Sequence, residues 1–232
     1  LFFIFMIVFG IKFCAFGWTQ TTSYLPIPMS VYDASIPSAG AIMLFYMIKN
    51  MAEQLKRLQD AGAAVLWRPL HEGADGWFWW SRGGAECYKK LWKLMYETFT
   101  KKHGLHNLIW IYSGTRLEWY PGDEYVDIAG IDLYPMGRCY GTQANAFLKA
   151  TELTGGTKPV MLSEYGSLPD PDRMDIENLK WLGCIVWEGQ YLTDEAGDYS
   201  EEYIEKEALK RFYDSSLVIT LDELPKRNGR SQ

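Results

Sequence analysis

The stretch AAVLWRPLHEGADGWFWW, residues 63–80, passes from a short apolar run into a loop that holds a His-Glu pair and several aromatic rings. The run AAVLWRPL has the length and composition of a buried strand. Gly73, Asp75 and Gly76 interrupt any helical pattern in the residues that follow. We therefore interpret the stretch as a strand end that opens into a wide loop.

Four further apolar runs resemble the first one: NLIWIYS, YVDIAGIDLYP, KPVMLSEYG and LGCIVWEG. Segments with helical spacing separate most of them, and MIKNMAEQLKRLQDAG and EEYIEKEALKRFYDS flank the series. Continuous apolar strands that alternate with helices indicate a parallel α/β sheet covered on both faces. An open doubly wound sheet and a (β/α)8 TIM barrel both fit this pattern. Strands are expected to begin near residues 64, 107, 126, 159 and 183.

Several classes of protein are disfavoured by what the sequence lacks. No GxGxxG follows the first strand and no GxxxxGK[ST] occurs, which removes the main support for a nucleotide-binding sheet. The net charge is −6 without a basic stripe, so we expect no nucleic-acid partner. The four cysteines are scattered without a CxxC, and HExxH is absent. We expect neither a metal nor a cofactor.

The first 46 residues differ from the rest of the chain. They carry two charged residues, Lys12 and Asp33, out of 52 in the whole sequence. The apolar opening is too short for a membrane span. It could be a buried strand, a foreign or frame-shifted start, or the apolar region of a secretory signal. We predict an atypical segment at 1–46 and a catalytic barrel portion at 47–232, with the barrel incomplete at its N-terminus.

Carboxylates stand at the ends of two predicted strands. In a barrel, catalytic groups lie at the C-terminal ends of the strands. VLWRPLHE ends in Glu72 and VMLSEYG contains Glu164, three strands further on, so both would face the same mouth. Glycoside hydrolysis requires such a pair, in which one carboxyl is protonated and the other is charged.

The surroundings of the two carboxylates suggest different roles. Glu72 adjoins the aromatic loop, where burial would favour the neutral acid. Arg68 and Tyr134 are candidate donors that would favour a charged Glu164. The alternative is that each glutamate is solvated or salt-bridged, as strand-end carboxylates often are. His71 could be a core histidine, a ligand of a sugar hydroxyl, or a partner of the second carboxylate.

RPLHEGADGWFWW resembles the acid/base signature of glycoside hydrolase family 26, whose members are mostly endo-β-1,4-mannanases. NLIWIYS, WYPGDEYVDIAGIDLYP, PVMLSEYG and VITLDELP are similar to that family in the same order, so the resemblance covers about residues 50–224. The resemblance implies a (β/α)8 barrel that hydrolyses with retention of configuration.

The resemblance also implies roles for individual residues. Glu72 matches the acid/base and Glu164 the nucleophile. Positions that frame the substrate are matched by His71, Trp77, Tyr134 and Trp187, and Arg68 is a further predicted substrate-binding residue. Glu188 departs from the residue that many members carry after that last tryptophan, and a further substrate-contacting histidine of the family has no counterpart in residues 1–46.

The function implied is that of a secreted, monomeric, retaining endo-glycosidase that cleaves β-1,4-mannosidic bonds in mannan or glucomannan. Its partner would be the polysaccharide, with no membrane partner. Three alternatives stay open: a β-glucanase or xylanase of the same family, a non-catalytic carbohydrate-binding barrel, and an inactive truncated fragment.

Overall fold

A computed structural model of the chain describes residues 34–224 together with residues 7, 11, 12, 14 and 15. The chain divides into two compact units, one of Leu1–Val65 and Met95–Leu108 and the other of Leu66–Leu94 and Ile109–Gln232. The alternatives for the apolar opening, whether strand, signal or foreign start, concern residues that lie mostly outside the described part.

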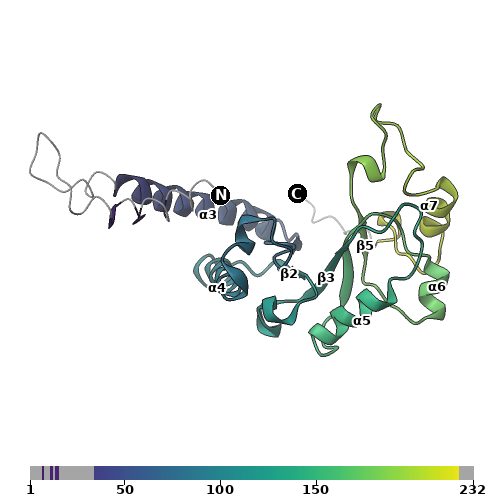
Figure 1. Cartoon of the computed structure of the whole chain (residues 1–232), viewed down its shortest axis with the longest axis horizontal. Coiled ribbons are helices and arrows are strands. Elements are labelled where there is room, and N and C mark those ends of the chain that lie inside the picture. The colour runs from purple at the N-terminus through teal and green to yellow at the C-terminus, as the bar shows by residue number, and fades with distance from the viewer. Residues whose placement is uncertain (1–6, 8–10, 13, 16–33, 225–232) are drawn as a thin grey trace, which may run out of the picture. The chain divides into compact units, whose positions relative to one another are not determined.

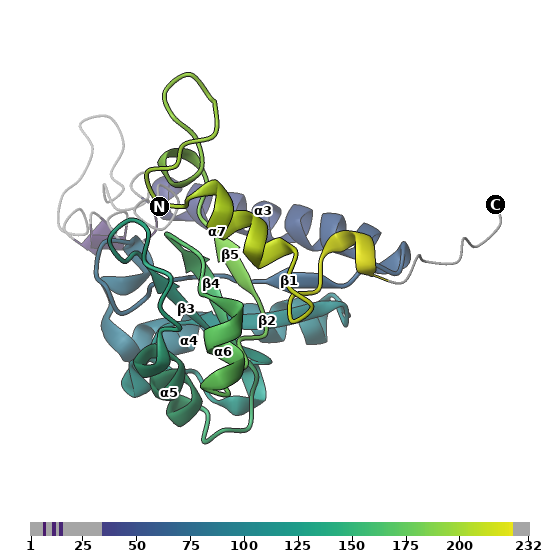
Figure 2. The ribbon, with the colours of Figure 1, turned by 90° about the vertical axis from the view of Figure 1, so that its right-hand side faces the viewer.

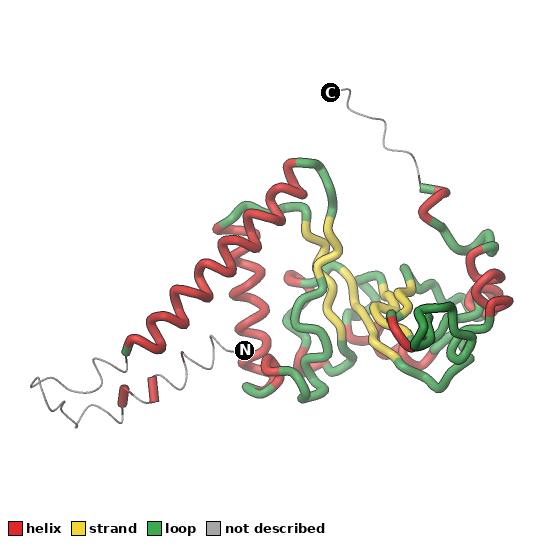
Figure 3. Tube along the Cα trace, turned by 90° about the horizontal axis from the view of Figure 1, so that it is seen from above, coloured by secondary structure: helices red, strands yellow, loops and turns green. Residues whose placement is uncertain are grey.

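The first unit contains the long helix α3, Ser35–Asp60 (Figures 1 and 3). The sequence predicts a helix from residue 47, and the structure begins it earlier, so residues 35–46 are helical as well. In its last turn, the Gln59 side-chain amide donates to the Gly104 carbonyl at 3.1 Å and accepts from the His106 backbone amide at 2.6 Å. The division at residue 46 stays a prediction. Among the described residues, no helix is both long and apolar enough to cross a membrane.

Five strands form one parallel sheet in the order β1-β2-β3-β4-β5, so neighbours along the chain are neighbours in the sheet (Figure 2). This confirms the five predicted strands. The sheet is curled, and its βα order is that of one side of a TIM barrel, the predicted fold class. The strands are β1 (Val65–Trp67), β2 (Leu108–Ser113), β3 (Ile128–Leu133), β4 (Val160–Tyr165) and β5 (Cys184–Val186).

Helices follow the strands as the sequence predicts. Helix α5 packs on β3 and β4, where Ala150 is buried among Ile131, Leu162 and Trp181. On the second unit's part of α4, Trp92 is fully buried, and its ring lies 5.9 Å from that of Trp110 in β2. The helices after β1 are α4 (Gly84–Glu97), which continues into the π-helical turn η2 (Thr98–Lys102), and then α5 (Ala144–Leu153), α6 (Pro171–Ile176) and α7 (Lys206–Tyr213).

Among the described α-helices of the second unit, α6 is the one that the sequence did not predict. Asp170 caps it, because its side chain accepts from the amides of Asp172 and Arg173 at 3.0 and 3.3 Å, and Pro171 occupies the first turn. The DPD sequence carries this capping signal, but six residues are too few for a periodic pattern. Short 3₁₀ turns complete the fold: η1 (Trp79–Ser81), η3 (Leu117–Trp119), η4 (Asp123–Tyr125), η5 (Gly189–Tyr191) and η6 (Leu221–Glu223).

Gly130 in the middle of β3 leaves room for Ser163 of β4 and Ile111 of β2. A Cβ at residue 130 would lie 2.5 Å from the Ser163 hydroxyl oxygen and 3.0 Å from a methyl of Ile111. The buried hydroxyl cannot move away without breaking its own hydrogen bonds. The glycine is therefore required by close approach of the strands.

We expect Gly130→Ala to lower the free energy of unfolding by about 1–3 kcal/mol, the usual cost of overpacking. Gly183→Ala is the matched control, because its Cβ would meet Met161 at an ordinary 3.5 Å. Urea titration of both variants checks the expectation. Equal stability of the two variants would contradict this account of the β3–β4 contact.

Candidate active site

Arg68, directly after β1, holds together the C-terminal ends of three other strands. Its guanidinium donates to the Asp132 carboxylate at 3.0 Å, to the Ser113 hydroxyl at 3.2 Å, and to Oε1 of Glu164. The side chains of Asp132 and Glu164 are 4% and 5% exposed. Buried charges of this kind persist when they are paired and hydrogen-bonded, and Arg68 provides both. The predicted contact between Arg68 and Glu164 is present.

Asp132 is held by two strands besides its own. Its Oδ1 accepts from the Ser163 hydroxyl at 2.6 Å, and the Ser163 and Ser113 hydroxyls lie 3.1 Å apart. Burial raises the pKa of Asp132 to about 6, although Arg68 and the Ser163 hydrogen bond lower it. The sequence marks Asp132 as a strand-end residue without assigning it to the site. A signal for it was present in the sequence: Asp132 lies two residues before Tyr134, and alternate residues of a strand share a face, so both side chains face the site.

Glu164 receives a second donor on its other oxygen. The Tyr134 hydroxyl donates to Oε2, so both oxygens of this buried carboxylate accept hydrogen bonds from side chains. Burial, and then the bond to Glu164, raises the pKa of Tyr134 and keeps it a donor. The predicted pair of donors, Arg68 and Tyr134, thus meets the same carboxylate. Donors on both oxygens fix the orientation of this carboxyl group.

Glu72 lies in the loop beyond β1 rather than at the last residue of that strand. The backbone turns sharply here, since Leu70 and Glu72 have φ of 51° and 52°, a conformation rare for residues other than glycine. The Trp77 indole N–H donates to Oε2 of Glu72 at 3.0 Å. Burial raises the pKa of Glu72, the charges of Asp132 and Glu164 raise it further, and the Trp77 bond opposes them.

The two glutamates come together at the C-terminal ends of the strands. One carboxylate oxygen from each of Glu72, Asp132 and Glu164 lies within 4.8 Å of the other two. Among the described residues, this group has the geometry to hold a metal ion. The Arg68 guanidinium forms ion pairs with two of these carboxylates, however, so an arginine already supplies a positive charge to the group.

His71 packs into the aromatic loop. Its ring centroid lies 4.7 Å from that of Phe78 and 5.6 Å from that of Trp80, and the Trp80 indole donates to the His71 carbonyl at 2.9 Å. Burial and then the Arg68 charge lower the pKa of His71 and favour the neutral ring. Within the described residues no hydrogen bond joins this ring to Glu164. The ring therefore forms part of the aromatic wall beside the glutamates.

A second group of aromatic rings follows β5 on the Glu164 side. The Trp187 ring is 42% exposed and meets Tyr134 edge-on at 6.4 Å. Tyr191 packs 5.2 Å from Tyr134 and 4.5 Å from Tyr203. The sequence singled out Trp187 and Tyr134, and the structure brings them together. It missed Tyr191, which comes from a turn with no strand-end signal.

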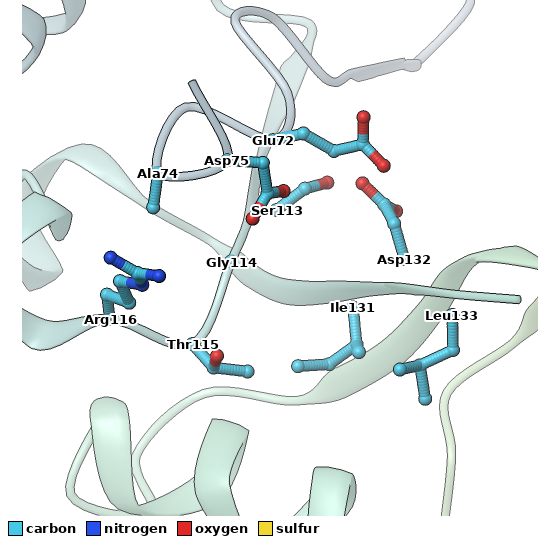
Figure 4. Close-up of a pocket in the computed structure, with 10 residues that line it drawn as sticks. All are labelled: Glu72, Ala74, Asp75, Ser113, Gly114, Thr115, Arg116, Ile131, Asp132 and Leu133. Carbon is cyan, nitrogen blue, oxygen red and sulfur yellow. The ribbon is translucent and has the colours of Figure 1, made fainter. Parts of the chain in front are cut away.

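A pocket of about 130 Å³ opens on the other side of Glu72 (Figure 4). Glu72 and Asp132 line one end of it, and Arg116 lies at the other end. Asp75 and Ser113 lie between them. Apolar residues complete the lining, so the pocket has a mixed polar and apolar character: Ala74, Ile131 and Leu133. The predicted site residues are thus gathered at the C-terminal edge of the sheet, between this pocket and the aromatic rings around Tyr134.

Comparison with known proteins identifies what this arrangement resembles. The sequence model of "Glycosyl hydrolase family 26" matches residues 12–223. A mannan endo-1,4-beta-mannosidase of Thermothelomyces thermophilus is 37% identical over 82% of this chain and 38% of its own length. Mannan endo-1,4-beta-mannosidase B of Piromyces sp. is 35% identical over 79% of this chain and 30% of its own length. The chain thus spans less than two fifths of these relatives.

A solved structure supports the same relation. The beta-mannanase from a symbiotic protist of the termite Reticulitermes speratus, complexed with gluco-manno-oligosaccharide, has a TM-score of 0.72 to this chain. The two are 38% identical, and the match covers 81% of this chain and 56% of the other.

The pKa of Asp132 predicts a pH dependence of stability. Because the folded value of about 6 lies above the ordinary 3.8, the folded protein binds more protons between these values. Asp132 therefore costs stability as the pH rises through that window. We expect Asp132→Asn to gain stability relative to the wild type from pH 4 to pH 6, on the order of 2 kcal/mol. Urea titrations of both proteins at several pH values measure this difference, and a constant difference would contradict the expectation.

Proposed function

The chain belongs to glycosyl hydrolase family 26, and we propose that it hydrolyses β-1,4-mannosidic bonds within mannan-type polysaccharides with retention of configuration. Two similar proteins carry the name mannan endo-1,4-beta-mannosidase, which supports the substrate class. A polysaccharide does not pass a cell membrane unaided, so we propose that the protein acts outside the cell. We also propose that it acts as a monomer.

The observation that carries the proposal is the closeness of Glu72 and Glu164. Retaining glycosidases separate their two carboxyl groups by about 5–5.5 Å, whereas inverting enzymes leave about 6.5–9.5 Å for a water molecule. A carboxylate oxygen of Glu72 lies within 4.8 Å of one of Glu164. This spacing favours direct attack by a carboxylate on the sugar.

In the first step, an oxygen of Glu164 attacks the anomeric carbon and forms an ester bond to the sugar. The bond from that carbon to the glycosidic oxygen breaks, and its electron pair stays on the oxygen. Glu72 gives its proton to that oxygen, for which its raised pKa suits it. Arg68 and Tyr134 hold Glu164 in place through its two oxygens.

In the second step, Glu72 is ionised and takes a proton from a water molecule that attacks the anomeric carbon. The ester bond to Glu164 breaks, and the carboxylate regains its electron pair. Two inversions restore the starting configuration. Each glutamate ends in the state in which it began.

The exposed aromatic rings supply surfaces for the sugars. Trp77 is 66% exposed and Trp187 is 42% exposed, so each residue offers ring surface on which a pyranose can stack. We assign His71 to the wall of the cleft and Arg68 to the positioning of Glu164, with no direct contact to the sugar required of Arg68.

Substitution of each glutamate tests the assignment. Glu164→Gln is expected to abolish turnover of both mannan and an activated aryl β-mannobioside, because no nucleophile remains. Glu72→Gln is expected to lower kcat/KM on mannan by about 10²–10⁴-fold but to spare the aryl substrate, whose leaving group needs little protonation. Glu152→Gln on α5, an exposed glutamate, serves as control.

Release of reducing sugar from mannan, glucomannan, mixed-linkage glucan and xylan identifies the backbone. Equal loss in both glutamate variants on the aryl glycoside would contradict the two roles. Preferential cleavage of glucan or xylan would replace the substrate class and leave the mechanism in place. Binding without any turnover would favour a carbohydrate-binding barrel.

Trp77 provides a test of the acid. Trp77→Phe keeps a ring but removes the N–H that lowers the pKa of Glu72. The pKa of Glu72 should rise, so the alkaline limb of the pH profile of kcat/KM should move to higher pH. Trp79→Phe is the control, because within the described residues its indole donates no hydrogen bond. An unmoved limb in Trp77→Phe would show that Glu72 is not the acid.

A further inference from the structure

We propose that the pocket beside Glu72 receives the sugar on the leaving-group side of the scissile bond, and that Arg116 and Asp75 bind its hydroxyl groups. The inference rests on the proposed function. The mechanism places the leaving group on the side of the acid, and the new element is the pair of side chains that bind its sugar. It names two residues that decide specificity for a sugar leaving group.

The position of the pocket relative to the two glutamates fixes the side. The acid must reach the glycosidic oxygen, and the nucleophile attacks the anomeric carbon from the opposite direction. Whatever is attached to that oxygen therefore extends past Glu72 and away from Glu164. The pocket is lined by Glu72 and Asp132 but not by Glu164, Tyr134 or Trp187. It continues over the ends of β2 and β3 toward Arg116 (Figure 4).

The lining is partly apolar and partly able to form hydrogen bonds with a sugar, and the charged residues provide the second part. Asp75 comes from the loop after β1, and Arg116 from the loop after β2, so two separate segments place opposite charges on one pocket. Within the described part of the chain, neither side chain forms a hydrogen bond or an ion pair with another residue. A carboxylate accepts from hydroxyls and a guanidinium donates to them in fixed directions.

The structure also distinguishes this pocket from the aromatic side of the cleft. Around Trp187 the exposed surface is aromatic and suits ring stacking. The pocket near Arg116 instead offers charged side chains, a hydroxyl of Thr115 and the backbone of Gly114. A leaving group without hydroxyls would fit there but would gain nothing from Arg116 or Asp75.

The test compares two leaving groups on the purified full chain. Mannotetraose presents a sugar to the pocket, and the activated aryl β-mannobioside presents a ring without hydroxyls. We expect Arg116→Ala to lower kcat/KM for mannotetraose about tenfold or more relative to the aryl substrate, the loss usual for one hydrogen bond to a charged group. Asp75→Asn should lower the same ratio. Arg173→Ala, an exposed arginine on α6, should leave it unchanged.

A binding measurement makes the result independent of turnover. Mannotriose is titrated calorimetrically into Glu164→Gln and into Glu164→Gln with Arg116→Ala, and the second protein should bind more weakly by a similar factor. If the ratio of the two substrates and this affinity are both unchanged by Arg116→Ala, the pocket assignment is wrong while the hydrolase can stand. If Arg116→Ala weakens binding but the wild type cleaves neither substrate, Arg116 binds a sugar and the proposed hydrolysis fails.

Discussion

The guanidinium of Arg68 is the interaction on which the site depends. It joins the strand ends of β2, β3 and β4 by donating to Ser113, Asp132 and Glu164 at once. Two buried carboxylates around one cation cost desolvation that the pairing must offset, and the pKa of Asp132 near 6 indicates that the compensation is incomplete. Removing Arg68 would leave these carboxylates close together without a cation. Because Ser163 completes the shell of Asp132, the close approach at Gly130 belongs to the same arrangement.

Arg68 contributes to the different surroundings of two glutamates that lie close together. Glu164 accepts hydrogen bonds on both oxygens, which fixes its direction. Glu72 has one indole donor, and burial and neighbouring negative charge raise its pKa. A carboxylate held in place by two donors and a neighbouring carboxyl with a raised pKa can act as nucleophile and as acid in one reaction. The two sides of the cleft differ. Aromatic rings lie beyond Glu164, whereas Glu72 is bonded to the exposed Trp77 and lines the pocket that holds Asp75 and Arg116.

Much of this could be read from the sequence, because parallel strands buried on both faces are continuous apolar runs and their ends share one edge. That rule places Glu72, Glu164 and Tyr134 at one mouth without any coordinates of a relative. The hydrogen bonds of Asp132 could not be read in the same way, since they depend on the register shift at Ile131 and Asp132 between β3 and β4. The early start of α3 was missed because its first turns contain Pro37 and Gly40 and the apolar run that follows has no helical periodicity, and α6 because it is too short to be periodic. The pocket at Arg116 arises from two loops, whose approach no local pattern encodes.

The central claim is that Glu164 forms a bond to the sugar while Glu72 assists. A 2-deoxy-2-fluoro-β-mannosyl fluoride tests it most directly. The fluorine at carbon 2 slows both steps, but the good leaving fluoride keeps the first step fast, so the ester accumulates. Mass spectrometry of the peptides after digestion should then find one fluoromannosyl group, on the peptide that contains Glu164. A label on the peptide that contains Glu72, or turnover to a product of inverted configuration with no trapped ester, would contradict the account.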